Sequence, residues 1–273
     1  MWVILAWPWL ALGAYRRRRY QDLDRLKVLI IPQTNRLGDL VCATPVFRAI
    51  KTKYPTAQIT VLVSNSKSAW KILAANPRID QIIFYEDAAL IQKLRQQKFA
   101  WSLALTTYPL PSLITYLALI PHRVKTVAYP RMLSEKLSDW LNTTLVQYKH
   151  HTSLPQHYLH LLEELDIWAD NIKPEVFINP AGEVKAGSLI NRLDLKSGLP
   201  LIGISVSAGN AIKEWGDQHF AELARRLSDN FRAMIVFIGV PADKVRIANL
   251  LSIYPGYQFK MAVDFNLEEL PSL

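Results

Sequence analysis

The sequence predicts an α/β protein with mostly parallel sheets, and two observations carry this prediction. The stretch 28–46, VLIIPQTNRLGDLVCATPV, joins a short aliphatic run to a polar turn and then to a helical pattern. Apolar runs and helical patterns of similar length alternate through the rest of the chain. Continuous aliphatic strands are typical of parallel sheets covered on both faces, and alternation with helices implies right-handed crossovers.

The first 25 residues are expected to lie outside the folded unit. Residues 2–14, WVILAWPWLALGA, are apolar, and the arginines at 16–19 follow them. In a secretory signal the basic residues precede the apolar stretch, so the order found here does not fit one. Thirteen helical residues would reach only about 20 Å, which is short of a bilayer core of about 30 Å. Tryptophans beside a basic cluster suit a segment lying in an anionic membrane interface, whereas an unstructured leader or an upstream translation start explains the same residues.

The first unit is predicted over 26–165. After the strand at 28–31, the Thr44-Pro45 pair predicts an N-cap and first helical position for a helix to about Lys53. The following patterns predict strands at 58–63, 81–85, 101–106 and 123–128, and helices at 66–75, 88–97, 111–119 and 154–165.

Residues 166–199 are predicted to be an interdomain region, because Pro, Gly and charged residues increase there around one helical stretch near 184–193. A second unit is predicted over 200–273. Its patterns predict strands at 201–206, 233–238 and 257–263, helices at 218–228 and 242–251, and the start of a helix at 267.

Composition narrows the function classes. Half of the 273 residues are apolar, which allows a sizeable core, and the net charge of +9 favours anionic partners. The chain carries no zinc-ligand cysteine pairs and no aromatic RNP-type motif, so nucleic-acid binding is not expected. The single cysteine, Cys42, excludes an intramolecular disulfide, and we interpret it as a packing residue.

Two loops are candidate ligand sites because each follows the first strand of its unit. In the first loop, Asp39 lies where an open α/β sheet binds ligands, although a helix-capping role explains it equally well. In the second loop, SAGNAIKEW, a phosphate would meet Ser207, Gly209, Asn210 and Lys213, while a small-residue turn with a solvated lysine would look the same.

Other enzyme classes are disfavoured by missing motifs. Neither loop is G-x-G-x-x-G or Walker A, which argues against nicotinamide enzymes and P-loop phosphohydrolases, and no G-x-S-x-G elbow exists for a hydrolase. The histidines at 150, 151, 157 and 160 lack metal-ligand spacing, so no metal site is predicted.

Two blocks of the sequence occur in a characteristic order: VLIIPQTNRLGDLVCATPVFRAIKTKYPTAQITVLV comes first and ISVSAGNAIKEWGDQHFAELARRL second. In both blocks and in their order, the chain resembles the lipopolysaccharide heptosyltransferase family, glycosyltransferase family 9. The resemblance extends from residue 26 to residue 273. The resemblance implies two Rossmann-like domains of B-type architecture facing across a cleft. It also implies inverting transfer of a heptose from an ADP-sugar to the inner core of lipopolysaccharide, at the cytoplasmic face of the inner membrane and without a metal or cofactor.

Carried over by position, the resemblance makes Asp39 the general base, with Asn35, Arg36 and Gly38 on the acceptor-side loop. Lys213 and the loop 207–210 would hold the donor diphosphate, and Asp243 would lie near the donor ribose. The family continues with a strand and an Asp-x-Gly-x-x-His loop that has no counterpart before residue 273. The sequence therefore predicts a C-terminally truncated second domain and little transferase activity. The alternative function is that of a non-catalytic remnant or membrane-associated binding protein.

Overall fold

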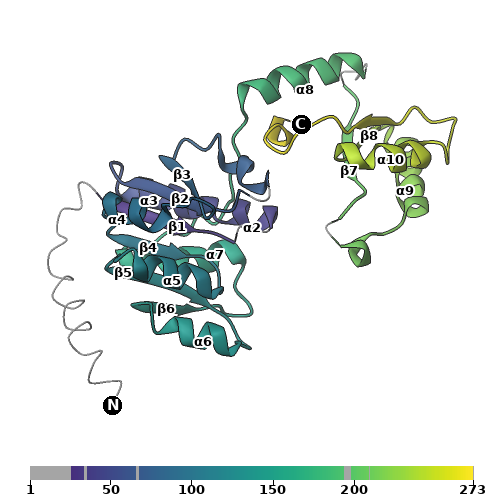
Figure 1. Ribbon diagram of the computed structural model, residues 1–273. Helices are drawn as coiled ribbons and strands as arrows, with labels where there is room; N and C mark the ends of the chain where they lie inside the picture. The colour runs from purple at the N-terminus through teal and green to yellow at the C-terminus, as the bar shows by residue number, and fades with distance from the viewer. Residues whose placement is uncertain (1–25, 34–35, 66–67, 194–197, 209, 273) are drawn as a thin grey trace, which may run out of the picture. The chain divides into compact units, whose positions relative to one another are not determined.

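The computed structural model describes residues 26–272 apart from 34–35, 66–67, 194–197 and 209 (Figure 1). The predicted leader, together with Asn35 and Gly209, lies outside the described residues. The chain divides into two compact units, residues 1–177 and 178–273, and each is described by itself. Among the described residues no helix is both long and apolar enough to cross a membrane.

The first unit is built on a six-stranded sheet in which every neighbouring pair is parallel, in the order β3-β2-β1-β4-β5-β6. Strand β1 lies in the middle because its side chains from Val28 to Ile31 are fully buried on both faces. The strands are β1 (Lys27–Ile31), β2 (Gln58–Val63), β3 (Gln81–Phe84), β4 (Trp101–Ala104), β5 (His122–Val127) and β6 (Thr144–Gln147).

One face of this sheet carries the larger core cluster, which includes Phe47, Ile50 and Tyr158. The elements that contribute to it are α2 (Leu37–Cys42), α3 (Thr44–Lys53), the 3₁₀ helix η3 (Ser68–Leu73), α7 (Leu154–His160) and the 3₁₀ helix η4 (Leu161–Leu165). On the other face, Leu94 and Ile114 bury α4 (Leu90–Gln97) and α5 (Pro109–Leu117) against β1 and β2.

The start of α3 differs from the prediction. Helix α2 runs almost directly into α3, so the N-cap is Ala43, in a helical conformation, and Thr44 is already the first helical residue. The Thr44 hydroxyl donates to the carbonyl of Val41 at 2.7 Å and accepts from the amide of Glu175 at 2.8 Å. Thr44 therefore anchors the segment around Glu175 instead of capping the helix.

Residues 166–199 are split between the two units. Glu175 pairs with Arg48 and Arg78, both at 2.7 Å, which holds its segment on the first unit. Helix α8 (Pro180–Arg192) begins four residues before the predicted helix and packs Ala186 and Leu189 in a core of the second unit. Most of the region expected to connect the domains thus belongs to the second unit.

The second unit contains a parallel sheet in the order β7-β8-β9, formed by β7 (Leu201–Ser205), β8 (Met234–Ile238) and β9 (Lys260–Ala262). Phe237 and Ala221, both fully buried, pack this sheet against α9 (Asp217–Phe231), and Ile247 adds α10 (Lys244–Leu251). Three short 3₁₀ helices complete the described part: η5 (Ala211–Lys213), η6 (Pro241–Asp243) and η7 (Leu270–Ser272).

Among the described residues, the strands and α-helices missing from the prediction are α2, β6 and α6 (Leu133–Asp139). In α6 the buried side chains are Glu135, Ser138 and Asp139, whereas Leu133 and Leu137 are exposed. Because the hydrophobic residues of α6 point outward, its pattern does not indicate a helix packed on a core. Two other predicted helices are shorter or partly 3₁₀: the helix expected at 66–75 is η3, and that at 154–165 continues from α7 into η4.

Candidate functional site

The carboxyl ends of β1 and β4 define the candidate site of the first unit. The strand order reverses between these two neighbours, since β2 and β3 lie on one side and β5 and β6 on the other. Gln33 follows β1 and Thr106 follows β4, and the Thr106 hydroxyl donates to the Gln33 side-chain oxygen at 3.0 Å. Ligands of open α/β sheets bind at such a reversal. The first candidate loop therefore lies at the edge of the sheet where open α/β sheets bind ligands.

Asp39 occupies the first turn of α2, directly after this edge. Its backbone amide donates to the carbonyl of Arg36 at 3.1 Å, so the turn is closed by backbone bonds and Asp39 is not the N-cap residue. The side chain is half-buried, and among the described residues its carboxylate has no hydrogen-bond or ion-pair partner. This arrangement disfavours the helix-capping explanation of Asp39.

Burial raises the pKa of the Asp39 carboxyl, and the positive charge of Arg36 opposes that rise. A carboxylate whose proton affinity is raised and whose oxygens are not engaged is suited to accept a proton from a bound hydroxyl group. Burial raises the pKa of the Cys42 thiol, and the negative charge of Asp39 raises it further. Cys42 therefore stays protonated at neutral pH and packs against the core, as the sequence predicts.

The wall beneath Asp39 is formed by α7. Burial raises the pKa of Tyr158, with smaller contributions from Asp39 and Cys42. The neighbouring His157 is buried, its Nε2 lies 3.2 Å from the Thr126 hydroxyl, and burial lowers its pKa to about 4. Tyr158 and His157 are therefore neutral at pH 7 and add no charge next to Asp39.

The other acceptor-side residues are open to solvent. Arg36 and Gly38 are both exposed, and a β-carbon added at Gly38 would meet no atom within 4 Å. Neither crowding nor a left-handed conformation requires glycine there. Because Gly38 has no side chain, it leaves the surface at the start of α2 open to solvent.

In the second unit the structure joins two of the predicted residues directly. Ser207 follows β7, Asp243 follows β8 at the end of η6, and the Ser207 hydroxyl donates to Asp243 Oδ2 at 2.8 Å. The same oxygen accepts from the amide of Val240 at 2.9 Å. Asp243 therefore ties together the loops that follow two adjacent strands, a positioning role that the sequence did not predict.

Asn210 and Lys213 form a small turn in the same loop. The Asn210 side chain accepts from the amide of Ile212 at 3.1 Å, and its carbonyl accepts from the amide of Lys213 at 3.0 Å. Lys213 is exposed, and its ammonium has no ion-pair partner among the described residues. The turn thus presents a free positive charge beyond the carboxyl end of β7, as a phosphate site requires.

A third group in this loop was missed from the sequence. Arg246 on α10 pairs with Glu214 at 2.8 Å and with Asp217 at 2.7 Å, while Glu214 also accepts from the amide of Ala208 at 3.3 Å. This network holds Glu214 at the far end of the loop and connects it to Ala208, the neighbour of Ser207. The paired residues are 29 and 32 positions apart in the sequence and form no local motif, so only the fold reveals the network.

The comparisons with known proteins decide the family. The profile of glycosyltransferase family 9 (heptosyltransferase) matches residues 88–273, more than half of the chain. The chain belongs to glycosyltransferase family 9. This confirms the resemblance that the sequence motifs indicate.

Two curated relatives are lipopolysaccharide heptosyltransferase 2 of Escherichia coli and of Salmonella typhimurium. Both are 25% identical to the chain over 78% of its length. The chain spans 63% of the length of each relative.

Solved structures confirm the fold. A family 9 glycosyltransferase from Veillonella parvula gives a TM-score of 0.75 at 18% identity, over 92% of this chain and 73% of that one. The ADP-heptose lipopolysaccharide heptosyltransferase II of E. coli gives a TM-score of 0.69 at 19% identity, over 90% of this chain and 75% of that one. The chain thus has the two Rossmann-like domains of B-type glycosyltransferases.

Membership in family 9 does not by itself assign the residues. Asp39 belongs to the first unit and Lys213 to the second, so the prediction that they face each other across a cleft stays a prediction. Within the described residues no group of three or more His, Cys, Asp or Glu side chains could hold a metal ion.

Proposed function

We propose that this family 9 protein transfers a heptose from ADP-heptose to the inner core of lipopolysaccharide, with inversion at the sugar carbon and without a metal ion. The observation that carries the proposal is Asp39, a half-buried carboxylate at the ligand edge with no partner among the described residues and a raised pKa. The relatives named as lipopolysaccharide heptosyltransferases support the choice of donor and acceptor.

In the proposed reaction Asp39 accepts the proton of the acceptor hydroxyl as that oxygen attacks the sugar carbon. The bond from this carbon to the diphosphate breaks in the same step, and ADP leaves with the bonding electron pair. A single displacement inverts the configuration, and a base at the acceptor oxygen promotes it by removing charge from the attacking group.

The loop of the second unit supplies the donor side. Lys213 and the amides near Asn210 would stabilise the negative charge that develops on the departing diphosphate. The Ser207–Asp243 bond and the Arg246 network hold the two ends of this loop in place before the donor binds. Asp243 Oδ1, which accepts no hydrogen bond from the described residues, is available to a ribose hydroxyl.

The test is a transfer assay with ADP-heptose and heptose-deficient lipopolysaccharide. Because the chain spans 63% of its curated relatives, the assay is run on the 273-residue chain and on the chain extended with the C-terminal part of the E. coli relative. Transfer by either version, with UDP-glucose as an inactive control donor, is the expected result. Binding of ADP-heptose without transfer by both versions would contradict the proposal and favour a non-catalytic binding protein.

A further inference from the structure

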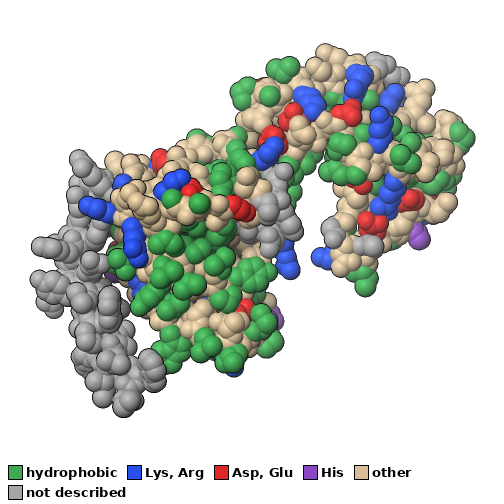
Figure 2. Space-filling view, viewed as in Figure 1, with side chains coloured by type: hydrophobic (Ala, Val, Ile, Leu, Met, Phe, Trp, Pro, Cys, Tyr) green, Lys and Arg blue, Asp and Glu red, His purple; other side chains and the backbone are tan. Residues whose placement is uncertain are grey.

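Helices α5 and α6 of the first unit lie side by side and expose their apolar side chains. On α5 the exposed residues Leu110, Leu113, Tyr116 and Leu117 repeat at helical spacing. On α6 the exposed residues are Leu133 and Leu137, and Trp140, which directly follows α6, continues their spacing. The segments before and after these helices add Tyr108, Leu119, Tyr129 and Met132. We call this set the α5–α6 face, and Figure 2 shows apolar side chains gathered over this part of the first unit.

The α5–α6 face is too large to be ordinary surface. Its exposures run from 40% at Leu117 to 89% at Trp140. At roughly 100 Å² for each half-exposed large side chain, the face reaches about 1,000 Å², whereas the largest apolar patch of a typical monomer is about 300–600 Å². A patch of this size indicates a surface that binds a partner.

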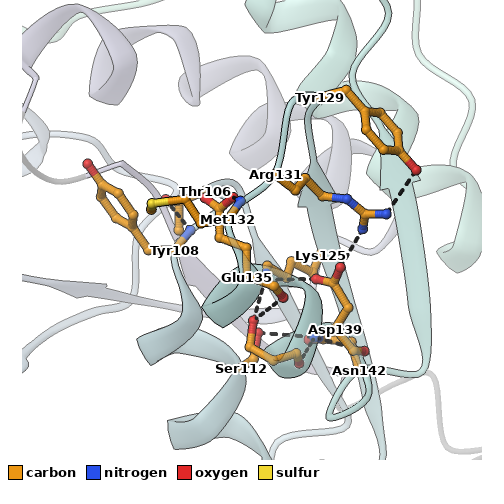
Figure 3. A network of polar contacts seen from close by, with 11 residues as sticks. Thr106, Tyr108, Ser112, Lys125, Tyr129, Arg131, Met132, Glu135, Asp139 and Asn142 are labelled. Atoms are coloured by element: carbon orange, nitrogen blue, oxygen red, sulfur yellow. Dashed lines mark hydrogen bonds and ion pairs between the residues drawn. The ribbon is translucent and has the colours of Figure 1, made fainter.

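The acidic residues of the two helices are turned away from this face. Glu135 accepts the amide of Met132 at 2.9 Å and is buried. Asp139 is held beneath α6 by Lys125 at 3.0 Å and by the guanidinium of Arg131, which also donates to the Tyr129 hydroxyl (Figure 3). No exposed carboxylate of α5 or α6 therefore contributes to the face.

The charges that border the α5–α6 face are positive. Lys136 is exposed between Leu133 and Leu137. The guanidinium of Arg123 lies 5.6 Å from the ring centroid of Tyr116, and that of Arg131 lies 4.6 Å from the ring centroid of Tyr129. Arg95 donates to the carbonyl of Leu117 at 2.9 Å, at the carboxyl end of α5. Leucines and aromatic residues bordered by cations are the composition of a surface that enters an anionic membrane interface.

A second copy of the chain fits this face less well. A two-fold dimer would bring the same patch together from both copies, so its cations would meet like charges with no exposed acid of α5 or α6 to pair with them. An anionic lipid headgroup layer supplies the complementary charge, and the acyl region accepts the leucines and Trp140.

We propose that the α5–α6 face is a docking surface for an anionic lipid bilayer. This inference goes beyond the proposed function and does not rest on it. It assigns membrane affinity to the folded first unit in addition to any contribution from residues 1–25. Tyr108 and Met132 follow β4 and β5, so one end of the face lies at the same sheet edge as Asp39. Docking would hold that edge next to the headgroups.

The test measures cosedimentation of the full chain with vesicles of phosphatidylcholine containing about one-third phosphatidylglycerol. The double variant Leu137→Glu/Trp140→Glu should bind at least about tenfold more weakly than the wild type, since both side chains are exposed and leave the core unchanged. The matched control is Trp168→Glu/Val245→Glu, which changes charge and apolarity equally at side chains 73% and 72% exposed elsewhere. The control should bind as the wild type does.

Leu113→Glu on α5 tests the same face independently, in case the double variant alters α6, and should also weaken binding. Wild-type affinity in the double variant and in Leu113→Glu would overturn the proposal. It would also be overturned if, without vesicles, light scattering found a wild-type dimer that the double variant splits, because the face would then bind a second copy. Neither readout uses a sugar donor, so this proposal can fail while the proposed function stands.

Discussion

The buried network beneath α6 gives the sharpest test of the stability of the first unit. The Lys125 ammonium is completely buried, and its described partners are the Ser138 hydroxyl at 2.8 Å and Asp139 at 3.0 Å. Asp139→Asn keeps the size of the side chain but removes the counter-charge. Breaking a buried ion pair by removing one partner costs about 3–5 kcal/mol, because the remaining charge stays out of water without compensation. We expect a loss of that size in the free energy of unfolding.

Lys125→Met should cost less, because Asp139 keeps Arg131, whose side chain is 17% exposed, as its partner. The double variant Lys125→Met/Asp139→Asn should be more stable than Asp139→Asn alone, since it no longer buries an unpaired ammonium. Asp166→Asn, which changes an exposed aspartate in a left-handed conformation that asparagine tolerates, is the control and should shift the value by no more than about 0.5 kcal/mol.

The assay is hydrogen exchange of peptides from the first unit across a urea series, because a chain of two units need not unfold in one step. A loss below about 1 kcal/mol for Asp139→Asn, or a double variant less stable than Asp139→Asn, would show that Asp139 does not compensate the buried charge of Lys125.

Three further predictions follow from the two sites and the leader. Folding raises the pKa of Asp39 above 3.8, so ionisation of Asp39 destabilises the folded state as pH rises. Asp39→Asn should therefore be more stable than the wild type at pH 7 and should lose this advantage near pH 3.8. Denaturation of both proteins at the two pH values measures the difference. Ser207→Ala should weaken ADP binding, measured by calorimetry, about three- to tenfold by freeing Asp243 and the loop, whereas Ser252→Ala at the C-terminal end of α10 should not. Deleting residues 1–20 should weaken cosedimentation with acidic vesicles, and equal binding would place all membrane affinity in the folded units.

The sequence predicts the sheet positions well where the aliphatic signal is continuous. Val28–Ile31 and Gln58–Val63 are buried strands with neighbours on both sides, so apolar runs mark them clearly. It fails at α6 because the apolar residues Leu133 and Leu137 face outward, and at Thr44 because the preceding helix leaves no room for a cap. A helix that packs on a core buries its apolar residues, whereas α6 exposes Leu133 and Leu137, so its hydrophobic pattern does not predict its packing.

The candidate site was predictable only in part. Asp39 and Lys213 follow the first strand of each unit, a position that sequence patterns locate. The Ser207–Asp243 bond and the Arg246 network join residues about 30 positions apart, and neither has a spacing signal. The raised pKa of Asp39 was equally invisible, because it arises from burial by the surrounding fold. Local motifs thus locate the candidate residues in the sequence, whereas tertiary contacts determine their hydrogen bonds and pKa values.

In the proposed reaction Asp39 removes the proton from the acceptor hydroxyl. The most direct measurement is the single-turnover rate of Asp39→Asn with saturating ADP-heptose and acceptor, in whichever version of the chain transfers sugar, beside Asp166→Asn as the control. Loss of a general base should lower the rate about 10²- to 10⁴-fold while calorimetry shows unchanged ADP affinity. An Asp39→Asn rate within about threefold of the wild type would contradict the assignment of Asp39 as the general base.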